Sequence, residues 1–224
     1  MRSETLAAPL GIFGGTFDPV HFGHLRLAEE AVGALGLCGV RWIPAGRPAL
    51  RDPPRGDARQ RLEMVRRAIA GNPRFELDPA EIDAPEPSYT VPTLERLRRP
   101  EICGADRPLV LLLGNDAFAG LTGWYQWERL FALAHVAVAH RPGHPVDPER
   151  LCPELAAVFR RRLCEDPRQL ADAPAGRVVV FATTPLDISA TRIRALLRGG
   201  ESPRYLMPDE VIVHIHRNRL YMED

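Results

Sequence analysis

Two stretches of the sequence carry residue types suited to binding phosphate. The first runs from Gly14 to His24 and reads GGTFDPVHFGH, with two glycines ahead of two histidines that lie three residues apart. Glycines let a ligand approach the backbone, and histidines at this spacing share one side of a helical turn. The second stretch, residues 188–194, reads ISATRIR. Ser189 is a favourable N-cap there, and helix N-termini favour phosphate, so both stretches predict an anion site.

Each stretch also has a simpler structural explanation. A strand-to-helix turn often needs glycines for packing, and Ser-x-x-Arg begins many helices, so Ser189 alone could be only a cap. A metal site would explain His21 and His24, but no third ligand lies nearby in the sequence. Packing rarely places two histidines against one glycine turn. The occurrence of both stretches in one chain therefore favours phosphate binding.

Arginine is the only basic residue type besides histidine. The sequence contains no lysine, so all 29 Lys+Arg residues are arginine. This excludes Schiff-base chemistry and the lysine of a P-loop. An anion site must therefore use arginine, histidine, backbone N–H groups or a metal. The 29 acidic residues bring the net charge to zero. The chain therefore lacks the excess of basic residues that is typical of proteins that bind nucleic acid or anionic membranes.

Targeting and cysteine signals are few. The four cysteines form no C-x-x-C pair, so zinc-ligand spacing is missing. No run of 18 apolar residues could span a bilayer, and the N-terminal segment lacks a long apolar core of a secretory signal. We therefore expect a cytoplasmic protein with reduced thiols, without a membrane or nucleic-acid partner, as a monomer or small homo-oligomer.

Short apolar runs alternate with helical periodicity along the chain. Strands are predicted at residues 10–14, 40–44, 75–77, 81–82, 108–114, 136–139 and 177–181. Helices are predicted at residues 25–36, 59–70, 90–98, 127–133, 155–164, 189–197 and 209–216, and residues 45–57 predict a loop. The alternation predicts an α/β fold with a doubly wound parallel sheet, which binds ligands at the carboxyl ends of its strands. We expect one domain over residues 1–224, with an inserted excursion near residues 141–175.

The two phosphate-binding stretches together resemble the nucleotidylyltransferase superfamily, through its HxGH and ISxTxIR motifs. Three further segments resemble its bacterial nicotinate-nucleotide adenylyltransferase branch: PSYTV at 87–91, LGND at 113–116 with Trp124 and Tyr125, and HVAVAHRPG at 135–143. The resemblance implies a Rossmann-like nucleotidylyltransferase fold. It also implies transfer of the adenylyl group of ATP to nicotinate mononucleotide, giving deamido-NAD and pyrophosphate in NAD biosynthesis. Mg²⁺ would be bound with the ATP phosphates, with no metal ligand expected from the protein.

The resemblance assigns roles to individual residues. Catalytic roles fall to His21, His24 and Arg194. ATP would be bound by Gly14, Gly15, Thr16, His21, His24, Gly114, Asp116, Ser189, Thr191 and Arg194. The mononucleotide would be bound by Asp18, Arg47, Arg51, Tyr89, Thr90, Trp124, Tyr125 and Arg141. Two of these have structural alternatives: Trp124 shares helical spacing with buried-type residues such as Leu121, and Asp116 could be an N-cap.

One loop departs from the family pattern. Family members usually carry Pro-Pro-His-Lys/Arg after the second strand, whereas residues 47–51 read RPALR. Arg47 and Arg51 are therefore the candidates to meet the mononucleotide phosphate. A non-catalytic nucleotide sensor stays open because the loop histidine is missing. An adenylyltransferase for another phosphorylated acceptor, such as nicotinamide mononucleotide, is the closest alternative. A class I aminoacyl-tRNA synthetase shares His-x-Gly-His but needs a lysine-bearing second signature.

Overall fold

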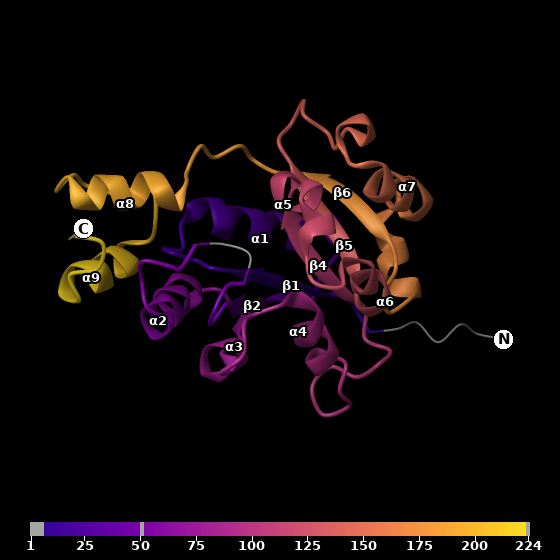
Figure 1. The fold of residues 1–224 in the computed structure, drawn as a ribbon, viewed down its shortest axis with the longest axis horizontal. Coiled ribbons are helices and arrows are strands. Elements are labelled where there is room, and N and C mark those ends of the chain that lie inside the picture. Colours follow the sequence, from indigo (N-terminus) through magenta and orange to yellow (C-terminus); the bar gives the residue numbers. More distant parts are fainter. Residues whose placement is uncertain (1–6, 50–51, 223–224) are drawn as a thin grey trace. The chain divides into compact units, whose positions relative to one another are not determined.

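A computed structural model describes residues 7–49 and 52–222 of the 224-residue chain. The strands form one six-stranded sheet in the order β3-β2-β1-β4-β5-β6, and the pairs β1–β4, β4–β5 and β5–β6 are parallel. Their bounds are β1 (Leu10–Gly15), β2 (Gly39–Pro44), β3 (Phe75–Leu77), β4 (Leu109–Gly114), β5 (His135–His140) and β6 (Val178–Ala182). This order is typical of a doubly wound fold and confirms the predicted class (Figure 1).

The helices alternate with these strands. They are α1 (Phe22–Leu35), α2 (Ala58–Ile69), α3 (Ala80–Asp83), α4 (Thr90–Leu97), α5 (Asn115–Ala119), α6 (Leu130–Leu133), α7 (Pro153–Arg162), α8 (Ala190–Arg198) and α9 (Asp209–Arg217). Among the described residues, no helix combines the length and apolar character needed to cross a bilayer.

Two predicted elements differ in the structure. The strand predicted at residues 81–82 is wrong, because these residues lie in α3. The Asp78 carboxylate accepts the backbone N–H of Ala80 at 3.1 Å, which turns the chain into a helix instead of a strand. The helix predicted at residues 127–133 is divided into a 3₁₀ turn, Trp127–Arg129, and α6.

The chain divides into two compact units, each made of separate segments. We call the first the β4 unit; it takes its described residues from 1–13, 28–40 and 89–184. The second, which we call the histidine unit, takes them from 14–27, 41–88 and 185–224 and includes both phosphate-binding stretches. The single domain with an excursion near residues 141–175 stays a prediction.

The β4 unit is built around three adjacent parallel strands. In β4 every residue except the last is buried, and β5 has the same pattern. Burial on both faces explains why β4 reads as an uninterrupted apolar run instead of an alternating one. Within this unit α4 packs against α6, and α5 packs against β4 and β5 (Figure 1).

In the histidine unit, helix α2 packs against α9 (Figure 1). The apolar residues Leu62, Val65 and Ile69 recur along α2 at helical spacing. Val65 and Ile69 are buried, but Leu62 is only half-buried, and the buried face also includes Met64 and Arg61. The inner face of α2 therefore includes a charged residue.

Candidate active site

The glycine turn at the end of β1 forms a compact support. A Cβ on Gly15 would lie 2.9 Å from the ring of Phe17, so only glycine lets that ring fold back over the turn. The Phe17 ring then lies edge-on to His24, with centroids 5.2 Å apart. Gly14 is exposed, and a Cβ there would meet no atom closer than 3.9 Å, so the turn leaves space beside Gly14.

The two histidines form a stacked pair. Their ring centroids are 3.7 Å apart, and the planes differ by 28°. The backbone N–H of His21 donates to Nδ1 of His24 at 3.2 Å, so the proton of a neutral His24 ring resides on Nε2. A Cβ on Gly23 would lie 3.0 Å from the His21 ring, which makes glycine the residue that fits between the histidines. The pair is thus held in one orientation, with Nε2 of His24 as a donor.

His21 is buried, with 7% of its surface exposed. Burial lowers the pKa of His21 to about 4, because the charged ring would lose its hydration. Its Nδ1 is buried and has no hydrogen-bond partner among the described residues. At neutral pH His21 is therefore an uncharged imidazole.

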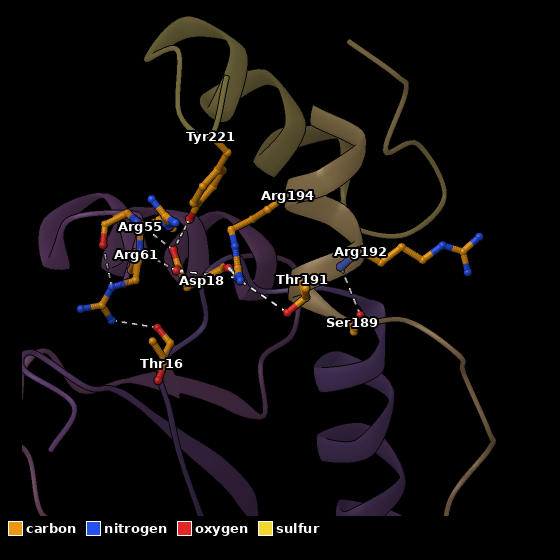
Figure 2. Close-up of polar contacts among 10 residues, drawn as sticks. Thr16, Asp18, Arg55, Arg61, Ser189, Thr191, Arg192, Arg194 and Tyr221 are labelled. Carbon is orange, nitrogen blue, oxygen red and sulfur yellow. Dashed lines mark hydrogen bonds and ion pairs between the residues drawn. The ribbon is translucent and has the colours of Figure 1, made fainter. Parts of the chain in front are cut away.

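The ISATRIR stretch begins helix α8 as predicted. Ser189 is its N-cap, and the Ser189 Oγ accepts the backbone N–H of Arg192 at 3.2 Å. One turn further, the Arg194 guanidinium donates to the carbonyl oxygen of Asp18 at 2.7 Å and to Oγ1 of Thr191 at 3.4 Å (Figure 2). The structure thus brings the second stretch against the first, at the Asp18 position.

Asp18 is a buried acceptor for several segments of the histidine unit. Its Oδ1 accepts the hydroxyl of Tyr221 at 2.6 Å and the N–H of Gly56 at 2.9 Å, while Oδ2 accepts the N–H of Arg55 at 2.8 Å (Figure 2). Burial, with the nearby Asp18 charge, raises the pKa of Tyr221, so its hydroxyl stays a donor. Both carboxylate oxygens of Asp18 are thus bonded to protein groups.

Arg61 is a buried residue that the sequence reasoning missed. Only 1% of its surface is exposed. Its guanidinium donates to four carbonyl oxygens, those of Thr16 (2.8 Å), Ala45 (2.6 Å), Gly46 (3.0 Å) and Gly56 (3.1 Å). Desolvation lowers the pKa of Arg61, and the charge of Asp18 opposes that shift. A signal was present, since Arg61 lies four residues before the buried Val65 and shares its helical face.

Two predicted ATP-binding residues lie at the carboxyl end of β4, in the β4 unit. Gly114 is the N-cap of α5, and Asp116 lies in the first turn of that helix with an exposed side chain. The alternative that Asp116 is the N-cap is therefore wrong, because Gly114 occupies that position. An exposed carboxylate just beyond a central strand can accept hydrogen bonds from a sugar.

The β4 unit also has an aromatic pair. The rings of Tyr89 and Tyr125 have centroids 5.0 Å apart and are tilted by 40°. Tyr125 is 49% exposed and Trp124 is half-buried, whereas Leu121 is fully buried. The packing explanation thus applies to Leu121, while the pair leaves aromatic surface accessible. Thr90 is the first residue of α4, directly after Tyr89.

The predicted arginines have different surroundings. Arg47 is exposed, and its guanidinium donates to the carbonyl oxygen of Pro85 at 2.8 Å. Arg141 is exposed directly after β5, and Arg51 lies outside the described residues. In the part of the chain that the structure describes, no three His, Cys, Asp or Glu side chains are grouped so that they could hold a metal ion.

Comparison with known proteins gives consistent results. A family model described as cytidylyltransferase-like matches residues 12–196. A protein of Dechloromonas aromatica (strain RCB), named probable nicotinate-nucleotide adenylyltransferase, is 59% identical over 216 residues, covering 96% of this chain and 99% of its own. A protein of the same name from Pseudomonas putida (strain W619) is 45% identical, covering 95% and 94%.

Solved structures share the fold. The Plasmodium falciparum nicotinic acid mononucleotide adenylyltransferase complexed with NaAD superposes with a TM-score of 0.69 at 15% sequence identity. The match covers 97% of this chain and 99% of that chain. A structure of the same enzyme complexed with APC gives a TM-score of 0.65.

Proposed function

The chain belongs to the cytidylyltransferase-like family, and from this membership we infer that it transfers the adenylyl group of ATP to nicotinate mononucleotide. The products are deamido-NAD and pyrophosphate. The observation that carries the inference is the stacked pair His21 and His24, placed in the same unit as Arg194 and within a chain 59% identical to a relative named for this reaction. The sensor alternative has no comparable support.

The chemistry suits these residue types. A phosphate oxygen of the mononucleotide attacks the α-phosphorus of ATP, and the bond from that phosphorus to the oxygen bridging to the β-phosphorus breaks. The second pKa of a phosphate monoester is about 6, so the nucleophile is already ionised at neutral pH. No general base is required. The protein must position two polyanions and stabilise the charge that develops between them.

We assign the triphosphate of ATP to the histidine unit. Nε2 of His24 donates to an oxygen of the α-phosphate, and the neutral His21 supports it through the ring stack. Arg194, with Thr191 and Ser189 at the start of α8, holds the β- and γ-phosphates. The exposed backbone at Gly14 lies where a ligand can approach it.

Residues of the β4 unit have most of the remaining roles. Gly114 and Asp116 bind the ATP ribose. Tyr89, Thr90, Trp124 and Tyr125 surround the pyridine ring and its carboxylate, for which an accessible aromatic pair is suited. From the histidine unit, Arg47 is the described arginine proposed to meet the mononucleotide phosphate, and Arg141 of the β4 unit is a further contact.

We propose that Mg²⁺ accompanies ATP. Since the described residues offer no three-ligand cluster, the ion would be held chiefly by phosphate oxygens, which are the hard ligands it prefers. When bound, it neutralises charge on the triphosphate. Of the proposed ATP-binding residues, only Asp116 could add a carboxylate oxygen.

A pyrophosphate-release assay tests the function. ATP is supplied with nicotinate mononucleotide or with nicotinamide mononucleotide in parallel reactions. A site that donates hydrogen bonds to a carboxylate loses about 1–3 kcal/mol for each donor that an amide leaves unpaired, so the acid should be strongly preferred. Equal turnover of both acceptors would refute the acid assignment. ATP binding with no turnover of either would favour the sensor alternative.

A further inference from the structure

Tyr221 lies far from both phosphate-binding stretches in the sequence, yet its hydroxyl reaches the centre of one of them. It donates to Oδ1 of Asp18 at 2.6 Å across a sequence separation of 203 residues (Figure 2). None of the motifs that identify the family includes this tyrosine. The effect of this hydrogen bond therefore depends on the role of Asp18.

Asp18 faces a competing partner on its other side. Its Oδ2 lies 3.8 Å from Nη1 of Arg194, which is within ion-pair distance but too long for a hydrogen bond. That same Nη1 donates instead to the neutral carbonyl oxygen of Asp18 at 2.7 Å. The guanidinium is thus fixed by an uncharged acceptor while the carboxylate beside it is directed elsewhere.

Three neutral donors hold the carboxylate away from the arginine: the Tyr221 hydroxyl and the N–H groups of Gly56 and Arg55. In a buried site an ion pair at contact distance is strong, because water does not screen it. If one donor were removed, the Asp18 carboxylate would turn toward the adjacent guanidinium. The 3.8 Å ion pair would then shorten to hydrogen-bond distance, and Arg194 would attract a ligand anion less strongly.

The packing around Gly56 shows how closely this arrangement is fitted. A Cβ on Gly56 would lie 2.7 Å from the Tyr221 hydroxyl and 3.0 Å from Oδ1 of Asp18. Any larger residue would displace the hydroxyl or the carboxylate. Arg61 fixes the same segment by donating to the Gly56 carbonyl oxygen at 3.1 Å. Glycine therefore permits the short hydrogen bond between the C-terminal segment and Asp18.

We propose that Tyr221 and Asp18 are positioning residues, which keep the charge of Arg194 available for the triphosphate of ATP. This inference rests on the proposed function in assigning Arg194 to ATP. Tyr221 touches no substrate in this account. It acts by satisfying the carboxylate, which would otherwise approach Arg194 to hydrogen-bond distance.

The test measures the Kd for ATP with Mg²⁺ by titration calorimetry, without the mononucleotide. Tyr221→Phe should raise this Kd about tenfold, as expected for weakening a charged hydrogen bond. Tyr205→Phe is the matched control, because Tyr205 lies in the same C-terminal region and is 87% exposed. It should bind ATP as the wild type does.

A double-mutant cycle separates this role from a general loss of structure. In an Arg194→Gln background, Tyr221→Phe should cause no further change in Kd. An equal loss in both backgrounds would overturn the proposal, and so would a Tyr221→Phe protein that binds ATP as the wild type does. If Tyr221→Phe does not fold by circular dichroism, Gly56→Ala provides the second variant, with the same tenfold rise expected and the same two refutations.

The outcome is distinguishable from failure of the proposed function. A wild-type protein that binds ATP but adenylylates neither mononucleotide would refute the reaction, while the Kd values would still decide the role of Tyr221. A wild-type protein that does not bind ATP would refute both.

Discussion

The histidine pair leads to a prediction in which two substitutions of one residue have opposite effects. His24 uses its two ring nitrogens differently: Nδ1 accepts the N–H of His21 at 3.2 Å, and Nε2 is the proposed donor to the α-phosphate. In His24→Asn, the side-chain oxygen lies near the position of Nδ1, but nothing replaces Nε2. In His24→Gln, the amide nitrogen extends toward the position of Nε2, and the Nδ1 acceptor is lost.

The expected magnitudes follow from the two bonds. Loss of a donor to the developing charge lowers kcat by about 10²–10³-fold, so His24→Asn should lose this much activity and His24→Gln clearly less. Loss of the bond to the His21 N–H costs about 0.5–1.5 kcal/mol, and about 1 kcal/mol shifts the Tm of a chain of this size by roughly 2–4 °C. His24→Gln should therefore melt lower than His24→Asn. Both variants lose the 3.7 Å ring stack, so that term cancels between them.

The assay is steady-state pyrophosphate release, with the Tm measured on the same preparations. His24→Ala lacks both groups and should combine the lower activity with the lower Tm. The reasoning would be refuted if His24→Asn were as active as His24→Gln. If activity followed Tm across all three variants, His24 would be a packing residue only.

Three further predictions concern neighbouring residues. The pKa of His21 is about 4 in the folded protein and 6.5 in the unfolded chain, so the unfolding free energy of the wild type should fall by roughly 3 kcal/mol more than that of His21→Gln between pH 6.5 and pH 4. If urea unfolding gave the same change of unfolding free energy with pH for both proteins, the burial argument would be contradicted. Arg61→Met should cost about 3–5 kcal/mol of unfolding free energy because it leaves buried carbonyl oxygens without their donor, whereas Arg59→Met, at an exposed position, should cost less than about 1 kcal/mol. Similar losses in the two variants would exclude a structural role for Arg61. Arg47→Ala should raise KM for the mononucleotide about tenfold with KM for ATP unchanged, and an unaltered mononucleotide KM would remove Arg47 from the site.

The parts of the fold that sequence could predict depend on local patterns. The apolar run of β4, the helical spacing of α1 and the Ser189 cap each follow from residues within a few positions of one another. The close approach of His21 and His24 is also local, because a spacing of three residues places both rings on one turn. These predictions are confirmed because no distant segment needs to be known.

One predicted strand and one structural alternative were wrong at positions where a helix begins. Residues 81–82 were predicted as a short strand, but the Asp78 carboxylate begins a helical turn just ahead of them. Asp116 has the side chain of an N-cap, but the chain already adopts the cap conformation at Gly114. At Asp116 a shift of two residues in the position of the N-cap decides the outcome, and sequence patterns locate helix ends least accurately.

The residues that sequence reasoning missed share a physical property: they bond to the backbone or across long separations. All four acceptors of the Arg61 guanidinium are backbone carbonyl oxygens. Because every residue type has this group, the residue types at those positions do not indicate the contact. Arg61 could be recognised only by its position on a buried helical face, where a charge must find partners. Tyr221 carries even less signal, because its acceptor Asp18 is 203 residues away and an aromatic residue near a chain end fits many environments. The side chains proposed to contact substrate lie in short motifs, whereas the contacts of Arg61 and Tyr221 that hold those motifs in place are identified only in the folded chain.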